Sequence, residues 1–326
     1  MDKIKIKVSS SSASLKLLLF KYKSIFVIYD RNVEEYVNKT FGKYPKLSFI
    51  ASEENKTMDS VLSICQWLME QNADRNALIL AVGGGTTTDT VGFAASIYKR
   101  GVRYANIPTT LLAQVDAAIG GKNGVNLDSY KNILGTIRQP EFTFINPKLL
   151  ETLPPREFNS GIAEMLKTFI IKDESLYERA VTVFTGERKK EDVQSLIESA
   201  AKIKASIVKK DFLDKDKRRV LNFGHSYAHA IEWFQHSHGV ASAFNHGEAV
   251  AIGMIQAARE SEELGYASSG LADRFAKDFA ACGLPTNVPC ALEDLDKAIK
   301  QDKKAEGGKV NFVLIERIGK VFIKKI

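Results

Sequence analysis

The chain has 326 residues, of which 44% are hydrophobic and 26% charged, and its formal net charge is +7. These proportions are typical of a globular protein and exclude a mainly disordered or collagen-like chain. At about 150 residues per domain, the length predicts roughly two domains.

The first half of the sequence alternates apolar strands with helical stretches. The helical pattern is clearest at residues 59–72, where apolar side chains form one stripe. The predicted strands are residues 1–8, 24–30, 46–51, 77–82, 104–107 and 142–145. Strands that alternate with helices predict an α/β domain with a parallel, Rossmann-like sheet, which we place at residues 1–150.

The pattern changes near Leu153-Pro154-Pro155. From there to about residue 302, helical periodicity dominates, and residues 192–211 are a clear example. A late two-stranded ribbon is predicted at residues 310–315 and 321–323. Residues 151–326 are therefore expected to form a mostly α-helical domain.

A glycine-rich turn, Gly83-Gly84-Gly85, follows a predicted strand and opens a helix. Glycines let the backbone approach a ligand, and a helix N-terminus attracts anions. The pattern favours a pyrophosphate site over a plain tight turn. Asp30, at the end of an earlier strand, is a weaker candidate for hydrogen bonding to a cofactor ribose.

All five histidines lie between residues 225 and 246. His225 and His229 share one face of a predicted helix, and His246 opens the next helix; we expect His236 and His238 to be surface residues of the loop between. Imidazoles plus a carboxylate describe a catalytic zinc site, but a helix-pairing histidine cluster is an equal alternative. Spacing leaves the carboxylate open, and the candidates are Glu164, Glu232 and Glu248.

Three further features limit location and partners. The cysteines, Cys65, Cys282 and Cys290, form no CxxC pair, so we expect a reducing cytoplasm and no disulfide scaffold. No apolar run approaches about 18 residues, which argues against a membrane partner. The basic residues are scattered, which disfavours nucleic-acid binding and leaves a small anionic substrate as the alternative.

At these residues the chain resembles the 3-dehydroquinate synthase family of the sugar phosphate cyclase superfamily. The matching stretches are distributed in order over nearly the whole chain. They are Gly83-Gly84-Gly85 with Asp89, Tyr98-Lys99-Arg100-Gly101, the run 108–116, Gly120-Gly121-Lys122, Lys131-Asn132, the run 153–157, Glu164 with Lys167, the run 221–225 with His229, the run 246–250, and Asp302-Lys303-Lys304.

The resemblance implies a set of ligands. Zinc or cobalt would be held by Glu164, His225 and His246. NAD would lie between the domains and contact Asp30, Asn32, Glu53, Lys56, Gly84, Gly85, Asp89, Thr109, Thr110 and Lys131. Substrate contacts would come from Asp116, Lys122, Asn132, Lys167, Lys204, Arg218, Asn222, His229 and Lys303, and Arg100 would reach the substrate phosphate across a homodimer interface.

The resemblance also implies a reaction, in which 3-deoxy-D-arabino-heptulosonate 7-phosphate becomes 3-dehydroquinate and phosphate while NAD is transiently reduced. The alternatives are a sister cyclase with another sugar phosphate and a zinc polyol dehydrogenase of the same wider fold. Lys204, Arg218 and Asn222 match the family's carboxylate-binding set, which argues against the sister cyclases because their substrates lack that group. A basic nucleic-acid-binding module is also disfavoured, because no stripe of basic and aromatic residues occurs.

Overall fold

The computed structural model describes residues 4–128, 130–240, 243–291, 294–295, 299 and 311–325. The chain divides into two compact units. The first comprises residues 1–154 and 204–213, and the second comprises residues 155–203 and 214–326.

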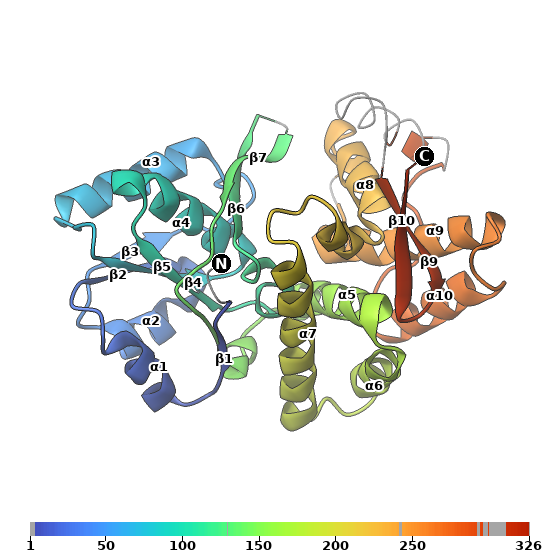
Figure 1. Cartoon of the computed structure of the whole chain (residues 1–326), viewed down its shortest axis with the longest axis horizontal. Coiled ribbons are helices and arrows are strands. Elements are labelled where there is room, and N and C mark those ends of the chain that lie inside the picture. Colours follow the sequence, from blue (N-terminus) through green and yellow to red (C-terminus); the bar gives the residue numbers. More distant parts are fainter. Residues whose placement is uncertain are drawn as a thin grey trace. The chain divides into compact units, whose positions relative to one another are not determined.

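A six-stranded sheet organises the first unit, with strand order β1-β8-β5-β4-β2-β3 (Figure 1). Every pair of neighbouring strands is parallel, which confirms the predicted fold class. The strands are β1 (Ile6–Val8), β2 (Ile25–Asp30), β3 (Lys46–Phe49), β4 (Leu78–Gly83), β5 (Arg103–Pro108) and β8 (Thr143–Ile145).

Helices cover both faces of this sheet. The apolar side chains of the central strands β2 and β4 are buried on both faces, as expected for a covered parallel sheet. On one face they pack against α1 (Ser12–Leu19) and α2 (Glu34–Phe41), and on the other against α3 (Met58–Glu70) and α4 (Gly85–Ile97). The turns that follow the carboxyl ends of β2, β4 and β5 carry residues that are predicted to bind the dinucleotide.

The sequence pattern predicted no strand between residues 108 and 141. The structure forms an antiparallel hairpin there, of β6 (Lys122–Leu127) and β7 (Tyr130–Ile137). A Cβ at Gly124 would lie 2.8 Å from the carbonyl oxygen of Leu134, so the two strands approach closely only because this position is glycine. Small and polar residues serve this pairing, and they weaken the apolar alternation that usually reveals a strand.

The second unit is mostly helical, as predicted (Figure 1). Its helices are α5 (Pro155–Lys172), α6 (Glu174–Thr185), α7 (Lys190–Lys210), α8 (His225–Ser237), α9 (His246–Glu263) and α10 (Leu271–Ala281). The last residues of α7, from Lys204 onward, belong to the first unit. Strands β9 (Asn311–Arg317) and β10 (Lys320–Lys325) form the predicted ribbon. Within the described residues, no helix has the length and apolar character needed to cross a membrane.

Candidate active site

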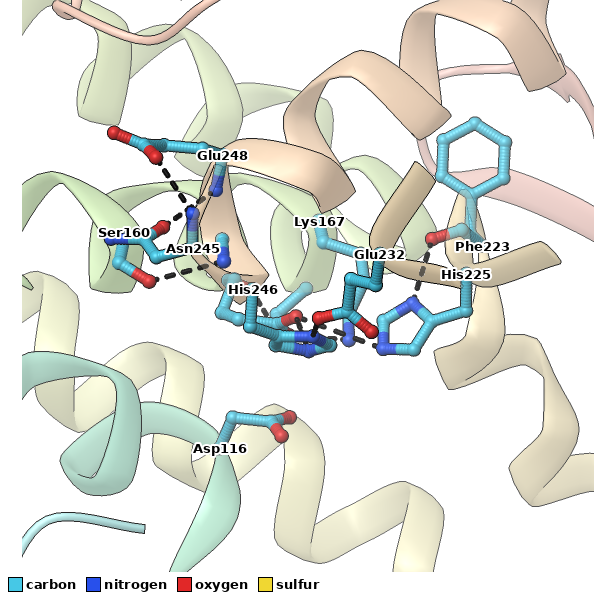
Figure 2. Close-up of polar contacts among 12 residues, drawn as sticks. Asp116, Ser160, Lys167, Phe223, His225, Glu232, Asn245, His246 and Glu248 are labelled. Atoms are coloured by element: carbon cyan, nitrogen blue, oxygen red, sulfur yellow. Dashed lines mark hydrogen bonds and ion pairs between the residues drawn. The ribbon is translucent and has the colours of Figure 1, made fainter. Parts of the chain in front are cut away.

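Three helices of the second unit bring together Glu164, His225 and His246. Figure 2 shows the two histidine side chains beside each other. Glu164 lies in the middle of α5, His225 is the first residue of α8, and His246 is the first residue of α9. His246 Nε2 lies 3.4 Å from Glu164 Oε1, and His225 Nε2 lies 3.8 Å from the same oxygen. One ligand atom from each residue falls within 4.8 Å of the other two. This is the set that the resemblance implied for the metal.

Local structure explains why both histidines open a helix. The Asn245 side chain accepts a hydrogen bond from the backbone amide of Glu248 at 3.0 Å, and the Glu248 carboxylate accepts one from the backbone amide of Asn245 at 2.8 Å. This capping box starts α9 at His246. Before α8, Gly224 adopts a φ of +81°, and a Cβ there would lie 2.7 Å from the Met254 amide nitrogen. A glycine is therefore required at the turn that presents His225.

The structure separates the three candidate carboxylates. Glu164 faces both histidines, whereas Glu248 closes the capping box and also binds the Arg156 guanidinium at 2.6 Å. Glu232 lies on the opposite edge of the His246 ring, 3.1 Å from Nδ1. Glu164 is thus the carboxylate that is placed to share a cation with two imidazoles.

The remaining histidines lie outside this group. The His229 ring is 5.6 Å from the His225 ring and its side chain is exposed, as expected for a residue that is not a metal ligand. His236 was predicted in a loop, but it lies in the last turn of α8, because the helix extends to Ser237. Both His236 and His238 are exposed, as predicted.

Burial and charge act together on the three candidate metal ligands. Burial raises the pKa of Glu164, but Lys167 and the two histidines outweigh it and hold that pKa well below its usual range. Lys167, itself buried, contacts the Glu164 carboxylate directly. Burial, followed by the positive charge of Lys167, lowers the pKa of His225 well below its ordinary value. For His246 burial acts in the same direction, but hydrogen bonds to Glu164 and Glu232 prevail and raise its pKa to about 10.

The donor set fits a divalent metal. One carboxylate and two imidazoles are the protein ligands of many catalytic zinc sites, which keep a fourth position open. Glu164 is fully buried, and a buried carboxylate needs a compensating positive charge. In the protein alone, Lys167 supplies that charge.

In the first unit, the glycine-rich turn has the close approach expected of an anion site. Gly84 caps α4, and a Cβ there would lie 2.9 Å from Thr110 Cγ2. The Thr109 amide donates to the Gly83 carbonyl at 3.0 Å, which ties the end of β5 to the end of β4. Two predicted NAD contacts, Thr109 and Thr110, therefore lie beside the turn that carries Gly84 and Gly85.

Lys56 joins further residues of the predicted site. Its buried ammonium group lies 2.7 Å from Asp89 Oδ2 on α4 and 2.6 Å from Asn132 Oδ1 on β7. Glu53 accepts a hydrogen bond from the Asn126 side chain at 2.8 Å. Asp30 accepts a hydrogen bond from the Asn32 amide at 3.0 Å, and burial raises the Asp30 pKa. Asn126 had no predicted role, although it links the predicted cofactor loop to the hairpin.

The predicted substrate residues are in varied settings. Lys204 binds the side chain of Asp116 at 2.6 Å and its carbonyl oxygen at 2.7 Å, so these two are together. Arg218 is buried, and Asn222 ends the 3₁₀ turn Lys217–Asn222 with an exposed side chain. Lys122, Asn132, His229 and Arg100 are also exposed, as is Lys131 among the predicted NAD contacts. Lys303 lies outside the described residues.

Known proteins match most of the chain. Sequence profiles of the N-terminal and C-terminal domains of 3-dehydroquinate synthase match residues 46–160 and 161–305. The chain belongs to the 3-dehydroquinate synthase family. Its relatives of that name include the protein from Dictyoglomus thermophilum, 42% identical over 83% of this chain and 76% of the relative. The protein from Campylobacter concisus is 40% identical over 83% of this chain and 77% of the relative.

Solved structures related to this 3-dehydroquinate synthase family member share its fold. The 2-epi-5-epi-valiolone synthase from Streptomyces hygroscopicus, solved with NAD⁺ and Zn²⁺ bound, is 25% identical and superposes with a TM-score of 0.89 over 99% of this chain and 93% of that one. A 2-deoxy-scyllo-inosose synthase complexed with carbaglucose-6-phosphate, NAD⁺ and Co²⁺ is 23% identical, with a TM-score of 0.85 over 98% and 93%.

Proposed function

We propose that this protein converts 3-deoxy-D-arabino-heptulosonate 7-phosphate to 3-dehydroquinate and phosphate, with NAD reduced and reoxidised in each cycle. The observation that carries the proposal is the convergence of Glu164, His225 and His246 from three separate helices. Relatives named for this activity and the zinc- and NAD-bound sister cyclase support it.

The proposed metal, Zn²⁺ or Co²⁺, would be held by Glu164, His225 and His246. When bound, such an ion supplies Lewis acidity that lowers the pKa of a substrate hydroxyl. The middle of α5 and the starts of α8 and α9 hold the donor atoms of the three side chains in place. Lys167 is close enough to Glu164 to hold or move a proton at its Nζ beside the metal ligands.

The proposed NAD site is at the carboxyl ends of the parallel strands, where ligands bind in open α/β sheets. When bound, NAD supplies the hydride acceptor of the first step and the donor of a later one. Backbone amides at the start of α4 favour its pyrophosphate. The proposed contacts are Asp30, Asn32, Glu53, Lys56, Gly84, Gly85, Asp89, Thr109, Thr110 and Lys131.

The proposed substrate carries a carboxylate and a phosphate, which suits lysine and arginine because these make charge-assisted hydrogen bonds to both groups. Arg218 is buried, and an arginine guanidinium can bind a carboxylate through two parallel hydrogen bonds. The other proposed contacts are Asp116, Lys122, Asn132, Lys167, Lys204, Asn222, His229 and Lys303. The homodimer that would let Arg100 contribute, the cytoplasmic location and the domain roles remain predictions.

A phosphate-release assay tests metal, substrate and reaction together. With NAD and zinc, the protein should release phosphate from the heptulosonate phosphate, and a chelator should abolish the release. NADH should not accumulate; steady growth of its absorbance with a polyol would instead indicate the dehydrogenase alternative. Folded, metal-loaded protein that releases no phosphate would contradict the proposal.

Arg218→Ala tests the substrate class, because it removes a proposed carboxylate contact. We expect a large loss of kcat/KM for the carboxylate-bearing substrate. Unchanged KM and kcat would remove Arg218 from the site. Turnover of sedoheptulose 7-phosphate or glucose 6-phosphate in preference to the heptulosonate would favour a sister cyclase.

A further inference from the structure

We propose that Glu232 is a positioning residue that orients the His246 ring so that Nε2 points at the metal. The inference rests on the proposed metal centre and extends it to a residue beyond the ligands. Glu232 is not placed to bind the same ion, because it contacts the edge of the His246 ring opposite to the edge that faces Glu164.

The two nitrogens of the His246 ring contact different carboxylates. Nδ1 lies 3.1 Å from Glu232 Oε1, and Nε2 lies 3.4 Å from Glu164 Oε1 (Figure 2). A hydrogen bond from Nδ1–H to Glu232 selects the tautomer whose Nε2 lone pair is free to ligate. It also fixes the rotation of the ring about its Cβ–Cγ bond. Glu232 therefore decides both which nitrogen is available and where it points.

Helix α8 places Glu232 for this role. Glu232 follows His225 by seven positions, which is about two helical turns, so both side chains lie on the same face. One helix thus supplies a ligand and the carboxylate that orients the ligand of its neighbour α9. The helices approach closely enough that a Cβ at Gly253 of α9 would lie 3.0 Å from the Ala228 amide nitrogen of α8. This close packing holds Glu232 and His246 at a constant separation.

His246 depends on such support more than His225 does. The His246 side chain is 38% exposed and has room to turn, whereas that of His225 is 15% exposed. The Nδ1 atom of His225 lies 3.4 Å from the backbone carbonyl of Phe223, two residues away in its own chain segment. Glu232, with a side chain only 11% exposed, makes a bond that water competes with weakly.

Glu260→Ala is a matched control for Glu232→Ala. Glu260 of α9 accepts a hydrogen bond from the Tyr227 hydroxyl of α8 at 3.0 Å, so it joins the same two helices away from the metal ligands. A structural loss at the α8–α9 contact should therefore affect variants at either glutamate. A loss of His246 orientation should affect only those at Glu232.

The test is the zinc affinity of the full chain, measured by competition with a chromophoric chelator without NAD or substrate. We expect Glu232→Ala to weaken zinc binding roughly 10–100-fold, as loss of an outer hydrogen-bond partner usually does. Glu232→Gln should weaken it less, because its amide oxygen still accepts a hydrogen bond. Glu260→Ala should retain wild-type affinity. In the cobalt-loaded proteins, the visible absorption bands should shift for Glu232→Ala alone.

Thermal unfolding of the metal-free proteins separates folding from metal binding. Wild-type zinc affinity in folded Glu232→Ala would overturn the inference and leave the proposed function intact. Equal loss of affinity in Glu260→Ala would also overturn it, because the effect would then belong to helix packing. A wild-type chain that binds neither zinc nor cobalt would instead contradict the proposed function itself.

Discussion

Ser160 and Gly247 join α5 to α9 beside the metal centre, where the Gly247 amide donates a hydrogen bond to Ser160 Oγ at 3.1 Å. Ser160 lies one helical turn before Glu164, and Gly247 directly follows His246. A Cβ at Gly247 would lie 2.5 Å from Ser160 Cα. The spacing between two proposed metal ligands therefore depends on a glycine.

Gly247→Ala is expected to force α5 and α9 apart. The nearest atoms belong to the Ser160 backbone and cannot rotate away, so overpacking should cost about 1–3 kcal/mol of unfolding free energy. Zinc affinity should fall with it, since Glu164 and His246 move with their helices. Ser160→Ala is the control: it removes only the hydrogen bond and should cost about 1 kcal/mol. Wild-type zinc affinity in Gly247→Ala would show that the contact does not set the ligand spacing.

Lys167→Met should strengthen divalent metal binding while it destabilises the metal-free protein. Lys167 competes with a cation for the buried Glu164 carboxylate. Removing its charge should relieve at least about 1 kcal/mol of repulsion and so tighten zinc roughly tenfold. Without metal, the loss of the buried Lys167 partner should cost about 3 kcal/mol, although His246 still faces the carboxylate. Chelator competition and thermal unfolding measure the two effects, and Lys172→Met, at the exposed end of α5, serves as control. Weaker zinc binding in Lys167→Met would contradict this.

Lys56→Met should destabilise the first unit in a pH-dependent manner. Burial lowers the pKa of Lys56, but its ion pair with Asp89 outweighs burial and raises that pKa above the usual 10.5. The stabilisation is therefore complete below pH 10.5 and is lost as pH rises through the raised value. At neutral pH the substitution should cost about 3 kcal/mol, because it leaves Asp89 without its buried partner.

Chemical denaturation from pH 7 to 12 tests the Lys56 prediction. The difference in unfolding free energy between wild type and Lys56→Met should be constant up to about pH 10.5 and should narrow above it. Lys39→Met, at an exposed position of α2, should show no such pH-dependent difference. A constant difference through the alkaline range would show that the ion pair is not its source.

How much was predictable from sequence differs between elements. Strands β2 and β4 are apolar up to their last residues, Asp30 and Gly83, so their burial and the parallel sheet followed from the pattern alone. The β6–β7 hairpin did not, because its glycines and asparagines serve backbone pairing and polar contacts. Residue spacing alone also left the choice among Glu164, Glu232 and Glu248 open, whereas the family resemblance indicated Glu164. Helical spacing gives the face of one helix, whereas this choice depends on how α5, α8 and α9 pack.

Asn126→Ala is expected to loosen the hairpin from the loop that carries Glu53 and Lys56. The Asn126 side chain donates a hydrogen bond to Glu53 at 2.8 Å and accepts one from the backbone amide of Asn132 at 2.9 Å. The backbone amide of Asn126 donates to the Lys56 carbonyl at 2.8 Å. Losing the two side-chain hydrogen bonds should cost about 1–3 kcal/mol. Hairpin amides should then exchange faster with deuterium, and NAD affinity should fall about tenfold, because only the Lys56–Asn132 contact and the backbone hydrogen bond to the Lys56 carbonyl would still join the loop to the hairpin.

Asn55→Ala separates this effect from a general disturbance of the loop. Asn55 lies in the same segment, but its side chain donates to the Ile50 carbonyl at 3.1 Å, on the loop itself. Hairpin exchange should therefore be unchanged in that variant. If Asn126→Ala leaves both exchange and NAD affinity at wild-type values, the loop and the hairpin are held by Lys56 alone, and its contacts with Asp89 and Asn132 are sufficient to order this part of the site.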